Sequence, residues 1–250
     1  MDAVETGNYV ICTTARSGSN LFCNYLGNTR RLGRPGELLN PDSVRASRFG
    51  RSLPPGSPVS IDAYFAWLRQ TFTTPKGIFG IKVLYEDFDN FKGFPLIQDY
   101  FASAKIYVLR RRSKLRQAIS YYFAEQTGQW VATDAARMAI EDVPFDFARI
   151  EQHLRRLCLQ DMAWITHLEA ARLPYREVIF EDFLKAPGDH LAAIARDLGM
   201  DPEGMPVEAT LKEQANARSA QFATQFADAF RAHAFTPSDT VCYKGLSFVA

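Results

Sequence analysis

YVICTTARSGSNLFCNYL, residues 9–26, joins a strand pattern to a helix pattern through a short polar turn. Residues 9–12 form a short apolar run of strand formers, which is typical of a strand buried on both faces. Apolar side chains at positions 21, 22, 25 and 26 lie on one face of a helix. The turn between them, residues 13–20, carries one glycine, four hydroxyls and one guanidinium. This order of elements predicts an α/β fold organised around the turn.

The turn at residues 13–20 has the chemistry of an anion site. Backbone N–H groups at the start of a helix and the positive end of its dipole both attract a negatively charged ligand. The sequence therefore predicts a bound phosphate or sulfate. The turn has no Gly-Lys-Ser/Thr, which a nucleotide-triphosphate P-loop requires, and Arg16 stands at its start instead. The plainer alternative is an ordinary strand–turn–helix junction that is capped by Ser19 or Asn20.

Length and composition limit the class of protein. The 250 residues suffice for one large α/β domain with a sizeable core. The 29 lysines and arginines almost balance the 28 acidic residues, which argues against a nucleic-acid partner. The four cysteines show no zinc-binding spacing and predict free thiols in a reducing compartment. Without an apolar leader or an apolar run of about 18 residues, the sequence predicts a cytoplasmic protein with no transmembrane segment.

Strand and helix patterns alternate along the rest of the chain. Further strands are expected at residues 77–85, 104–109 and 176–180. Helices are expected at residues 61–70, 95–101, 114–125, 147–168, 190–198 and 208–233. This alternation, without a β-hairpin signal, predicts a mainly parallel central sheet flanked by helices, with one domain spanning residues 1–250. Residues 27–60 are rich in Gly, Pro and Ser, and such a long irregular stretch often marks a functional or mobile segment.

A second basic element follows the third predicted strand. Arg110-Arg111-Arg112 comes directly after residues 104–109. In open parallel sheets, ligands bind beyond the carboxyl ends of the strands, near the point where the strand order reverses. We therefore expect the turn at residues 13–20 and the triple arginine to serve the same ligand. The alternative is a basic run on the solvated start of a helix.

ARSGSN at residues 15–20, followed by an apolar helix and then GRPGELL at 33–39, resembles the sulfotransferases that use PAPS (3′-phosphoadenosine 5′-phosphosulfate). More narrowly, it is similar to the bacterial trehalose 2-sulfotransferase family. The resemblance implies an α/β, P-loop-like three-layer fold and PAPS as the sulfuryl donor. It also implies that the 5′-phosphosulfate is bound by five consecutive residues, Arg16, Ser17, Gly18, Ser19 and Asn20. Asn20 departs from the family, which commonly has a hydroxyl there, although an amide can still donate to a phosphate oxygen.

The stretch RRRSKLRQAIS, residues 110–120, resembles the element that binds the 3′-phosphate in sulfotransferases. Arginine offers a planar fork that matches phosphate, and Ser120 adds a neutral donor. The trehalose-type spacing favours Arg111 as the phosphate ligand, whereas the wider sulfotransferase pattern favours Arg112. We take Arg111 as the first candidate and Arg112 as the second.

The same resemblance places a general base at Glu37. Sulfuryl transfer to an alcohol requires removal of the hydroxyl proton as the S–O bond forms, and a nearby carboxylate can take it. Arg16 would stabilise the charge that grows on the departing 5′-phosphate. The alternative for Glu37 is a loop glutamate that faces water. This scheme requires no metal.

Three weaker matches complete the set of candidate site residues. GIFGIK at 77–82 makes Lys82 a candidate substrate ligand, or else a strand-end lysine that reaches solvent. QTGQW at 126–130 makes Trp130 a candidate sugar platform, or else a core tryptophan. KEQANARS at 212–219 resembles a segment that closes over the nucleotide, with Arg218 as its candidate ligand beside Gln214 and Ser219.

These patterns together predict a PAPS-dependent sulfotransferase that acts on a hydroxyl of a carbohydrate or glycolipid, with a trehalose-like sugar as one candidate acceptor. Two alternatives stay open. An NTP-dependent kinase on a related fold lacks its Gly-Lys-Ser/Thr here. A non-catalytic nucleotide- or glycan-binding protein would keep the pocket without the reaction. Phe222, Phe226 and Phe230 lie four residues apart, a stripe that is typical of core or of a subunit contact and makes a homodimer the candidate assembly.

Overall fold

The computed structural model describes residues 7–131, 134–211, 217–234, 240–243 and 246–249. The described chain falls into two units, one formed by residues 7–117 and 154–211, the other by residues 118–153 and those from 217 onward. The helices α7 (Lys114–Thr127) and α8 (Phe147–Ala170) each contribute to both units. The expectation of one domain over residues 1–250 stays a prediction.

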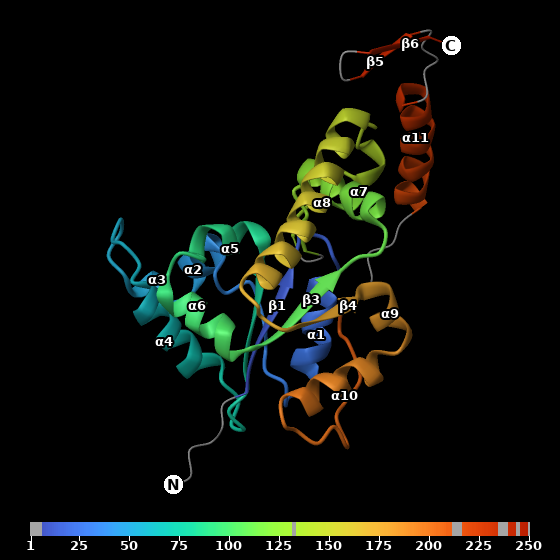
Figure 1. Cartoon of the computed structure of the whole chain (residues 1–250). Coiled ribbons are helices and arrows are strands. Elements are labelled where there is room, and N and C mark those ends of the chain that lie inside the picture. The colour runs from blue at the N-terminus through green and yellow to red at the C-terminus, as the bar shows by residue number, and fades with distance from the viewer. Residues whose placement is uncertain (1–6, 132–133, 212–216, 235–239, 244–245, 250) are drawn as a thin grey trace. The chain divides into compact units, whose positions relative to one another are not determined.

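A four-stranded parallel sheet forms the centre of the first unit (Figure 1). The strands are β1 (Asn8–Thr13), β2 (Phe79–Leu84), β3 (Lys105–Arg110) and β4 (Tyr175–Ile179). Their spatial order is β2-β1-β3-β4, and Thr13 pairs with Leu84 on one side and Leu109 on the other. All four predicted strands are confirmed to within two residues, and so is the parallel α/β architecture.

Helices cover both faces of this sheet, which gives the three layers that the sequence predicts (Figure 1). One face packs against α4 (Ile61–Phe72), α5 (Tyr85–Phe91), α6 (Pro95–Ser103) and the second half of α8. The other face packs against α1 (Ser19–Asn28), α9 (Phe180–Lys185) and α10 (Pro187–Asp197). Successive β1 residues alternate between the two cores, because side chains of a strand point to opposite faces. Every helix predicted before residue 200 is present.

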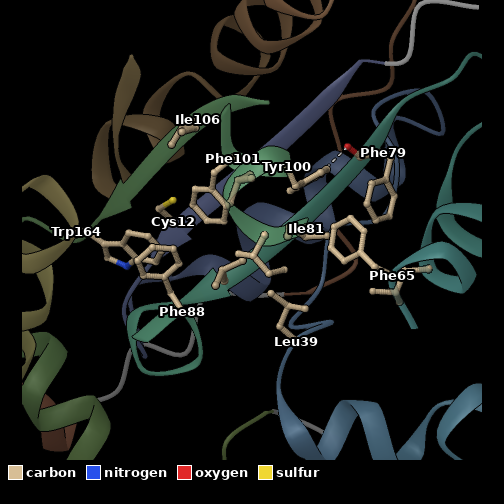
Figure 2. Close-up of a cluster of buried hydrophobic side chains, with 14 of the residues drawn as sticks. Cys12, Leu39, Phe65, Phe79, Ile81, Phe88, Tyr100, Phe101, Ile106 and Trp164 are labelled. Atoms are coloured by element: carbon tan, nitrogen blue, oxygen red, sulfur yellow. Dashed lines mark hydrogen bonds between the residues drawn. The ribbon is translucent and has the colours of Figure 1, made fainter. Parts of the chain in front are cut away.

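Aromatic side chains fill the core on the α8 side of the sheet (Figure 2). Trp164 of α8 is fully buried against Phe88 and Phe101. Its indole N–H donates to the carbonyl of Thr13, the last residue of β1, at 2.8 Å. The hydroxyl of Tyr100 donates to the carbonyls of Tyr9 at 3.0 Å and of Phe79 at 3.3 Å. Both rings therefore bury apolar area while satisfying backbone acceptors that water cannot reach.

The second unit has its own aromatic core. Phe222 and Phe226 of α11 (Ala217–Ala234) are buried, whereas Phe230 is exposed. Phe222 packs against side chains of α7 and Phe145, and Phe226 stacks on Phe147. The stripe is therefore mostly core of its own unit, and a homodimer stays a prediction. The unit also contains a turn of 3-10 helix (Ile140–Asp142) and an antiparallel pair, β5 (Thr240–Tyr243) and β6 (Leu246–Val249), which the sequence reading missed.

The structure contains four short helices that the sequence analysis did not predict, and one predicted helix begins later than expected. Residues 27–60 contain two short helices, α2 (Pro41–Ala46) and α3 (Arg48–Ser52), each begun by a side chain that accepts from the first turn, Asn40 and Ser47 respectively. An N-cap asparagine before proline is a start signal that could have been recognised. The short helices α5 and α9, which directly follow strands, were also missed. Residues 208–211 are not helical, because Asn24 of α1 accepts the backbone N–H groups of residues 210 and 211 at 2.8 and 3.1 Å.

Two further observations concern the state of the cysteines and whether any described helix could span a membrane. Cys12 and Cys23 are free and buried, and Cys158 is free and partly exposed. The side chain of the fourth cysteine, Cys242, lies outside the described residues. Within the described chain, no helix has the length and apolar character needed to cross a bilayer.

The Trp164 hydrogen bond gives a stability prediction. Trp164→Phe leaves the buried Thr13 carbonyl without its donor and opens a small cavity, so we expect the free energy of unfolding to fall by about 2 kcal/mol. Leu159→Ala on the same helix is the control, because Leu159 is 71% exposed and its loss should change stability by less than about 0.5 kcal/mol. Urea denaturation of both variants measures the difference, and equal effects would contradict the role of Trp164.

Candidate functional site

The candidate site lies at the carboxyl ends of β1 and β3. These strands are neighbours, while β2 pairs with the other edge of β1, so the strand order reverses at β1. A crevice at such a reversal is the usual ligand position in parallel sheets. The structure brings together the two elements that the sequence singled out, because Nη1 of Arg111, just after β3, donates to the carbonyl of Arg16 at 3.4 Å.

The N-terminus of α1 follows β1 at this edge of the sheet and begins at Gly18. Gly18 is the N-cap residue, with a φ of 92°, and among the described residues no side chain makes a capping hydrogen bond to this helix. The alternative that Ser19 or Asn20 caps the junction is therefore wrong. A Cβ at position 18 would lie 2.4 Å from the ring of Phe180, so only glycine fits there. The first-turn N–H groups of α1 are thus presented to a ligand without a competing side chain.

Buried polar side chains form hydrogen bonds with the turn at residues 13–20. The Thr14 hydroxyl donates to Oδ1 of Asp161 at 3.0 Å. Nε2 of Gln117 donates to the Thr14 hydroxyl at 2.9 Å and to the carbonyl of Ala15 at 2.7 Å. The hydroxyls of Ser17 and Thr13 lie 2.7 Å apart, and all these side chains are buried. Because each buried polar group has a partner, the turn is fixed before any ligand binds.

Acidic partners engage most of the basic cluster that follows β3. Arg110 contacts Asp161 at 3.2 Å, and Lys114 also forms an ion pair with Asp161. Arg112 forms an ion pair with Asp182. One carboxylate, buried in α8, therefore balances two of these cations.

Arg111 and Arg112 point to different surroundings. The side chain of Arg112 is 61% exposed and lies along α9, where its backbone N–H also donates to Glu181 at 2.9 Å. The side chain of Arg111 is 19% exposed, contacts Glu181 only at 3.8 Å, and reaches the turn at Arg16. Of the two candidates, Arg111 is the one that contacts the turn, and the assignment of the 3′-phosphate stays a prediction.

Arg16 and Arg111 form a pair of like charges. Burial and the nearby Arg111 guanidinium lower the pKa of Arg16. Arg16 also has a left-handed backbone with a φ of 61°, a conformation that is uncommon for a residue with a side chain. Two guanidinium groups held beside a helix N-terminus repel each other, and an anion between them relieves the repulsion.

Glu37 lies beside this turn and is held by a buried lysine. Nζ of Lys82 contacts Oε1 of Glu37 at 2.7 Å and donates to Oδ1 of Asn20 at 2.5 Å. Lys82 belongs to β2 and is only 3% exposed, so the alternative that it reaches solvent is wrong. The side chain of Glu37 remains 32% exposed. The structure therefore joins three predicted site residues in one chain of contacts, with Glu37 at its accessible end.

The loop that carries Glu37 is anchored although it has no regular structure. The backbone N–H of Lys82 donates to the carbonyl of Gly36 at 2.9 Å. The hydroxyl of Tyr64 donates to the carbonyl of Leu38 at 2.7 Å, and Leu39 is buried in the core of Figure 2. Contacts on both sides of Glu37 thus fix its position relative to β2.

The remaining candidates belong to the second unit. Trp130 is 40% exposed and packs edge-on to Tyr121 at 5.1 Å, so the core-tryptophan alternative is wrong. Arg218 donates to the carbonyl of Val143 at 3.1 Å and lies over the ring of Phe222. Ser120 lies on α7 in the part that belongs to this unit, and Gln214 lies outside the described residues. Their participation in the site stays a prediction.

Comparison with known proteins identifies the family. The sequence model of the Stf0 sulphotransferase family matches residues 8–229. The chain belongs to the Stf0 sulphotransferase family. This agrees with the family suggested by ARSGSN and GRPGELL, and it makes the protein a sulfotransferase-family enzyme rather than a kinase. No curated protein matches the chain.

One solved structure supports the fold, and a second gives a weaker match. A sulfotransferase from Alicyclobacillus acidocaldarius superposes with a TM-score of 0.51 at 18% identity, covering 92% of this chain and 95% of that one. A retinol dehydratase in complex with retinol and PAP, the desulfated nucleotide, gives a TM-score of 0.40 at 12% identity, covering 94% of this chain and 83% of that one.

The sequence patterns did not identify the buried residues that form hydrogen bonds with the turn of this sulfotransferase. Asp161 and Gln117 come from helices that lie about a hundred residues or more from Thr14 along the chain. Charged and amide side chains are common on helices, so neither residue carries a local signal. The basic residues at 110 and 114 hinted that a buried carboxylate must exist, but not where it lies.

A substitution at Gly18 tests whether this turn of the sulfotransferase binds the nucleotide. Gly18→Ala brings a methyl group onto the Phe180 ring and requires a left-handed alanine, so the turn must shift. We expect the affinity for PAP to fall at least about tenfold, because the N–H groups no longer converge on one anion.

Gly93→Ala is the matched control, since nothing lies within 4 Å of the added Cβ there. Isothermal titration calorimetry with PAP measures the affinity, and far-UV circular dichroism checks that both variants are folded. Unchanged PAP affinity in Gly18→Ala would show that the ligand does not use this turn.

Proposed function

We propose that this Stf0-family enzyme transfers the sulfuryl group of PAPS to a hydroxyl of a carbohydrate or glycolipid acceptor. The observation that carries the proposal is the Arg16–Arg111 pair at the uncapped start of α1, with the accessible carboxylate of Glu37 tied to the same turn through Lys82 and Asn20. Anion-binding groups and a base held on one rigid frame are what transfer between a nucleotide and an alcohol requires.

The proposed donor site uses the turn residues Arg16, Ser17, Gly18, Ser19 and Asn20 for the 5′-phosphosulfate. Backbone N–H groups and a fixed guanidinium stabilise charge that develops on the departing phosphate, and they need no rearrangement during the reaction. Asn20 has its oxygen on Lys82, which leaves its amide nitrogen as the donor end. The repulsion between Arg16 and Arg111 favours a ligand with two anionic groups, and PAPS carries a 5′-phosphosulfate and a 3′-phosphate.

Arg111 is proposed to bind the 3′-phosphate, with Ser120 as its neutral partner. The position of Arg111 against the turn supports this choice over Arg112, which is committed to Asp182 on an exposed surface. Binding energy at this remote phosphate orients the reacting sulfuryl group, the contribution that distant contacts make to catalysis. Arg218 is proposed as an additional nucleotide ligand from the second unit.

The proposed reaction is an in-line displacement. The acceptor oxygen attacks sulfur, its proton passes to the Glu37 carboxylate, and the bond between sulfur and the 5′-phosphate oxygen breaks, which leaves PAP. A carboxylate works as a base here only if it is ionised and aimed. The Lys82 ammonium supplies the aim, since it holds one oxygen of Glu37 at 2.7 Å. In this scheme the protein's cations neutralise the leaving group without a metal ion.

The acceptor is proposed to be a small sugar or the sugar part of a glycolipid, with a trehalose-like disaccharide as the first candidate. The exposed indole of Trp130, edge-on to Tyr121, offers an apolar face of the kind on which sugar rings stack. The burial of Lys82 favours a role in holding Glu37 over direct contact with the acceptor.

Nucleotide binding tests the proposed donor site. We expect PAP to bind without added magnesium, and we expect Arg16→Ala and Arg111→Ala each to raise the Kd about 30-fold or more, because each removes a charge-assisted contact worth about 2 kcal/mol. Isothermal titration calorimetry in the presence of EDTA measures these values.

Arg112→Ala is the control and should change the PAP Kd less than about threefold, because that guanidinium is exposed and paired elsewhere. Binding of ATP with magnesium in place of PAP would overturn the proposed donor. A larger effect of Arg112→Ala than of Arg111→Ala would reverse the assignment of the 3′-phosphate.

The base is tested by Glu37→Gln. This change keeps the shape and removes the proton acceptor, so we expect kcat for sulfuryl transfer to fall by about 10²- to 10⁴-fold with the PAP Kd unchanged within threefold. Transfer from radiolabelled PAPS to a panel of mono- and disaccharides measures kcat. Glu177→Gln, a partly exposed partner of Arg110, is the control and should keep full activity. Tight PAP binding with no turnover on any acceptor would instead favour a binding protein without the reaction.

A further inference from the structure

Gln117, a fully buried amide near the start of α7, has no part in the scheme above. Its Nε2 atom donates to the Thr14 hydroxyl at 2.9 Å and to the Ala15 carbonyl at 2.7 Å. Its Oε1 atom accepts from Nζ of Lys114 at 2.9 Å. Lys114 and Thr14 each also bind Asp161, so the side chains of Thr14, Gln117, Lys114 and Asp161 form a closed ring.

This ring permits one arrangement of its protons. An ammonium only donates, so the Gln117 atom that faces Lys114 must be the oxygen. A carbonyl only accepts, so the atom that faces Ala15 must be the nitrogen. The Thr14 hydroxyl accepts from this nitrogen and donates to the Asp161 carboxylate. A flipped amide would lose these contacts inside the core, and the orientation of Gln117 is therefore fixed.

The segment that carries Gln117 holds two consecutive carbonyls of the turn. Gln117 binds the carbonyl of Ala15, and Nη1 of Arg111 donates to the carbonyl of Arg16. A trans peptide unit points its N–H opposite to its carbonyl, so the N–H groups of Arg16 and Ser17 are turned away from these two donors. Arg16 has a left-handed backbone, and successive N–H groups around such a residue form a concavity that binds an anion.

We propose that Gln117 is a positioning residue that aims the N–H groups of Arg16 and Ser17 at the 5′-phosphate of the donor. It acts through the backbone, by holding the Ala15 carbonyl, and not through contact with the nucleotide. Because the ring fixes the Gln117 amide, the two N–H groups are aimed before the donor arrives, and binding costs no rearrangement of the turn. The inference rests on the proposed donor site, and it explains why an amide is kept in a fully buried place.

Amide NMR of the free protein tests the positioning step without any nucleotide. In Gln117→Leu the Ala15 carbonyl loses its donor, so we expect the backbone N–H signals of Arg16 and Ser17 to move. Gln160→Leu is the matched control, since this glutamine of α8 donates to a side chain of α5 at 3.0 Å and its loss should leave both signals in place. Equal shifts of these signals in the two variants would overturn the inference.

Phosphorus-31 NMR of PAP at saturation supplies the second readout, because its 5′- and 3′-phosphates give separate signals. A free phosphate gains its second proton near about pH 6, and N–H donors that hold the dianion move this titration to lower pH. In the Gln117→Leu complex we expect the 5′ signal to titrate at least about half a pH unit higher than in the wild type, with the 3′ signal unchanged. The PAP Kd should rise about tenfold. A purely structural loss would move both signals or neither.

Gln117→Glu is the second variant, in case the leucine variant does not fold. It keeps the shape and the oxygen that accepts from Lys114, but it replaces the donor that holds Ala15 with an acceptor, so the 5′ signal should change as in Gln117→Leu. Far-UV circular dichroism checks that each variant is folded. A 5′ titration equal to that of the wild type in both variants would overturn the inference alone. Failure of the wild type to bind PAP would overturn the proposed donor, and the role of Gln117 with it.

Discussion

The ion pair between Lys82 and Glu37 is the constraint on which the site depends. An ammonium inside a sheet is tolerated only when its charge is balanced and its protons are bonded. Lys82 meets this need with Glu37 from the preceding loop, and it also donates to Asn20 at the start of α1. Because one buried charge takes partners from both segments, the loop of Glu37 and the start of α1 are held at a fixed relation within the first unit.

Asp161 does the same for the other side of the turn. It is buried in α8, accepts from Thr14 and balances Arg110 and Lys114. The basic cluster after β3 therefore does not act as one diffuse positive patch. Arg110 and Lys114 form structural ion pairs with Asp161, and Arg111 is the member that contacts Arg16. A run of like charges becomes specific for a ligand when most of its members are neutralised by the fold.

The sequence predicted the elements whose signals are local, and it failed where distant residues meet. The strand at residues 9–12 and the turn that follows it both come from short patterns, and each is present. The preference for Arg111 came from family spacing and stays a prediction, and the contact of Arg111 with Arg16 is one that spacing alone does not contain. The pairing of Lys82 with Glu37 and the support of the turn by Asp161 join segments tens of residues apart, and no periodicity reports such contacts. Residues 208–211 look helical by composition, but Asn24 captures their amides, an example of tertiary structure overriding propensity.

The choice of arginine in the turn fits the division of charge across this site. A guanidinium keeps its charge throughout the physiological range, even where burial and Arg111 lower the pKa of Arg16, so in the proposed reaction it stabilises the leaving phosphate without exchanging protons. In the proposed reaction all proton transfer falls to the acceptor side, where Lys82 holds Glu37. Titratable groups near the phosphates would let the donor-binding charge vary with pH. The proposed scheme therefore separates binding, which needs constant charge, from deprotonation, which needs a base that can change its charge.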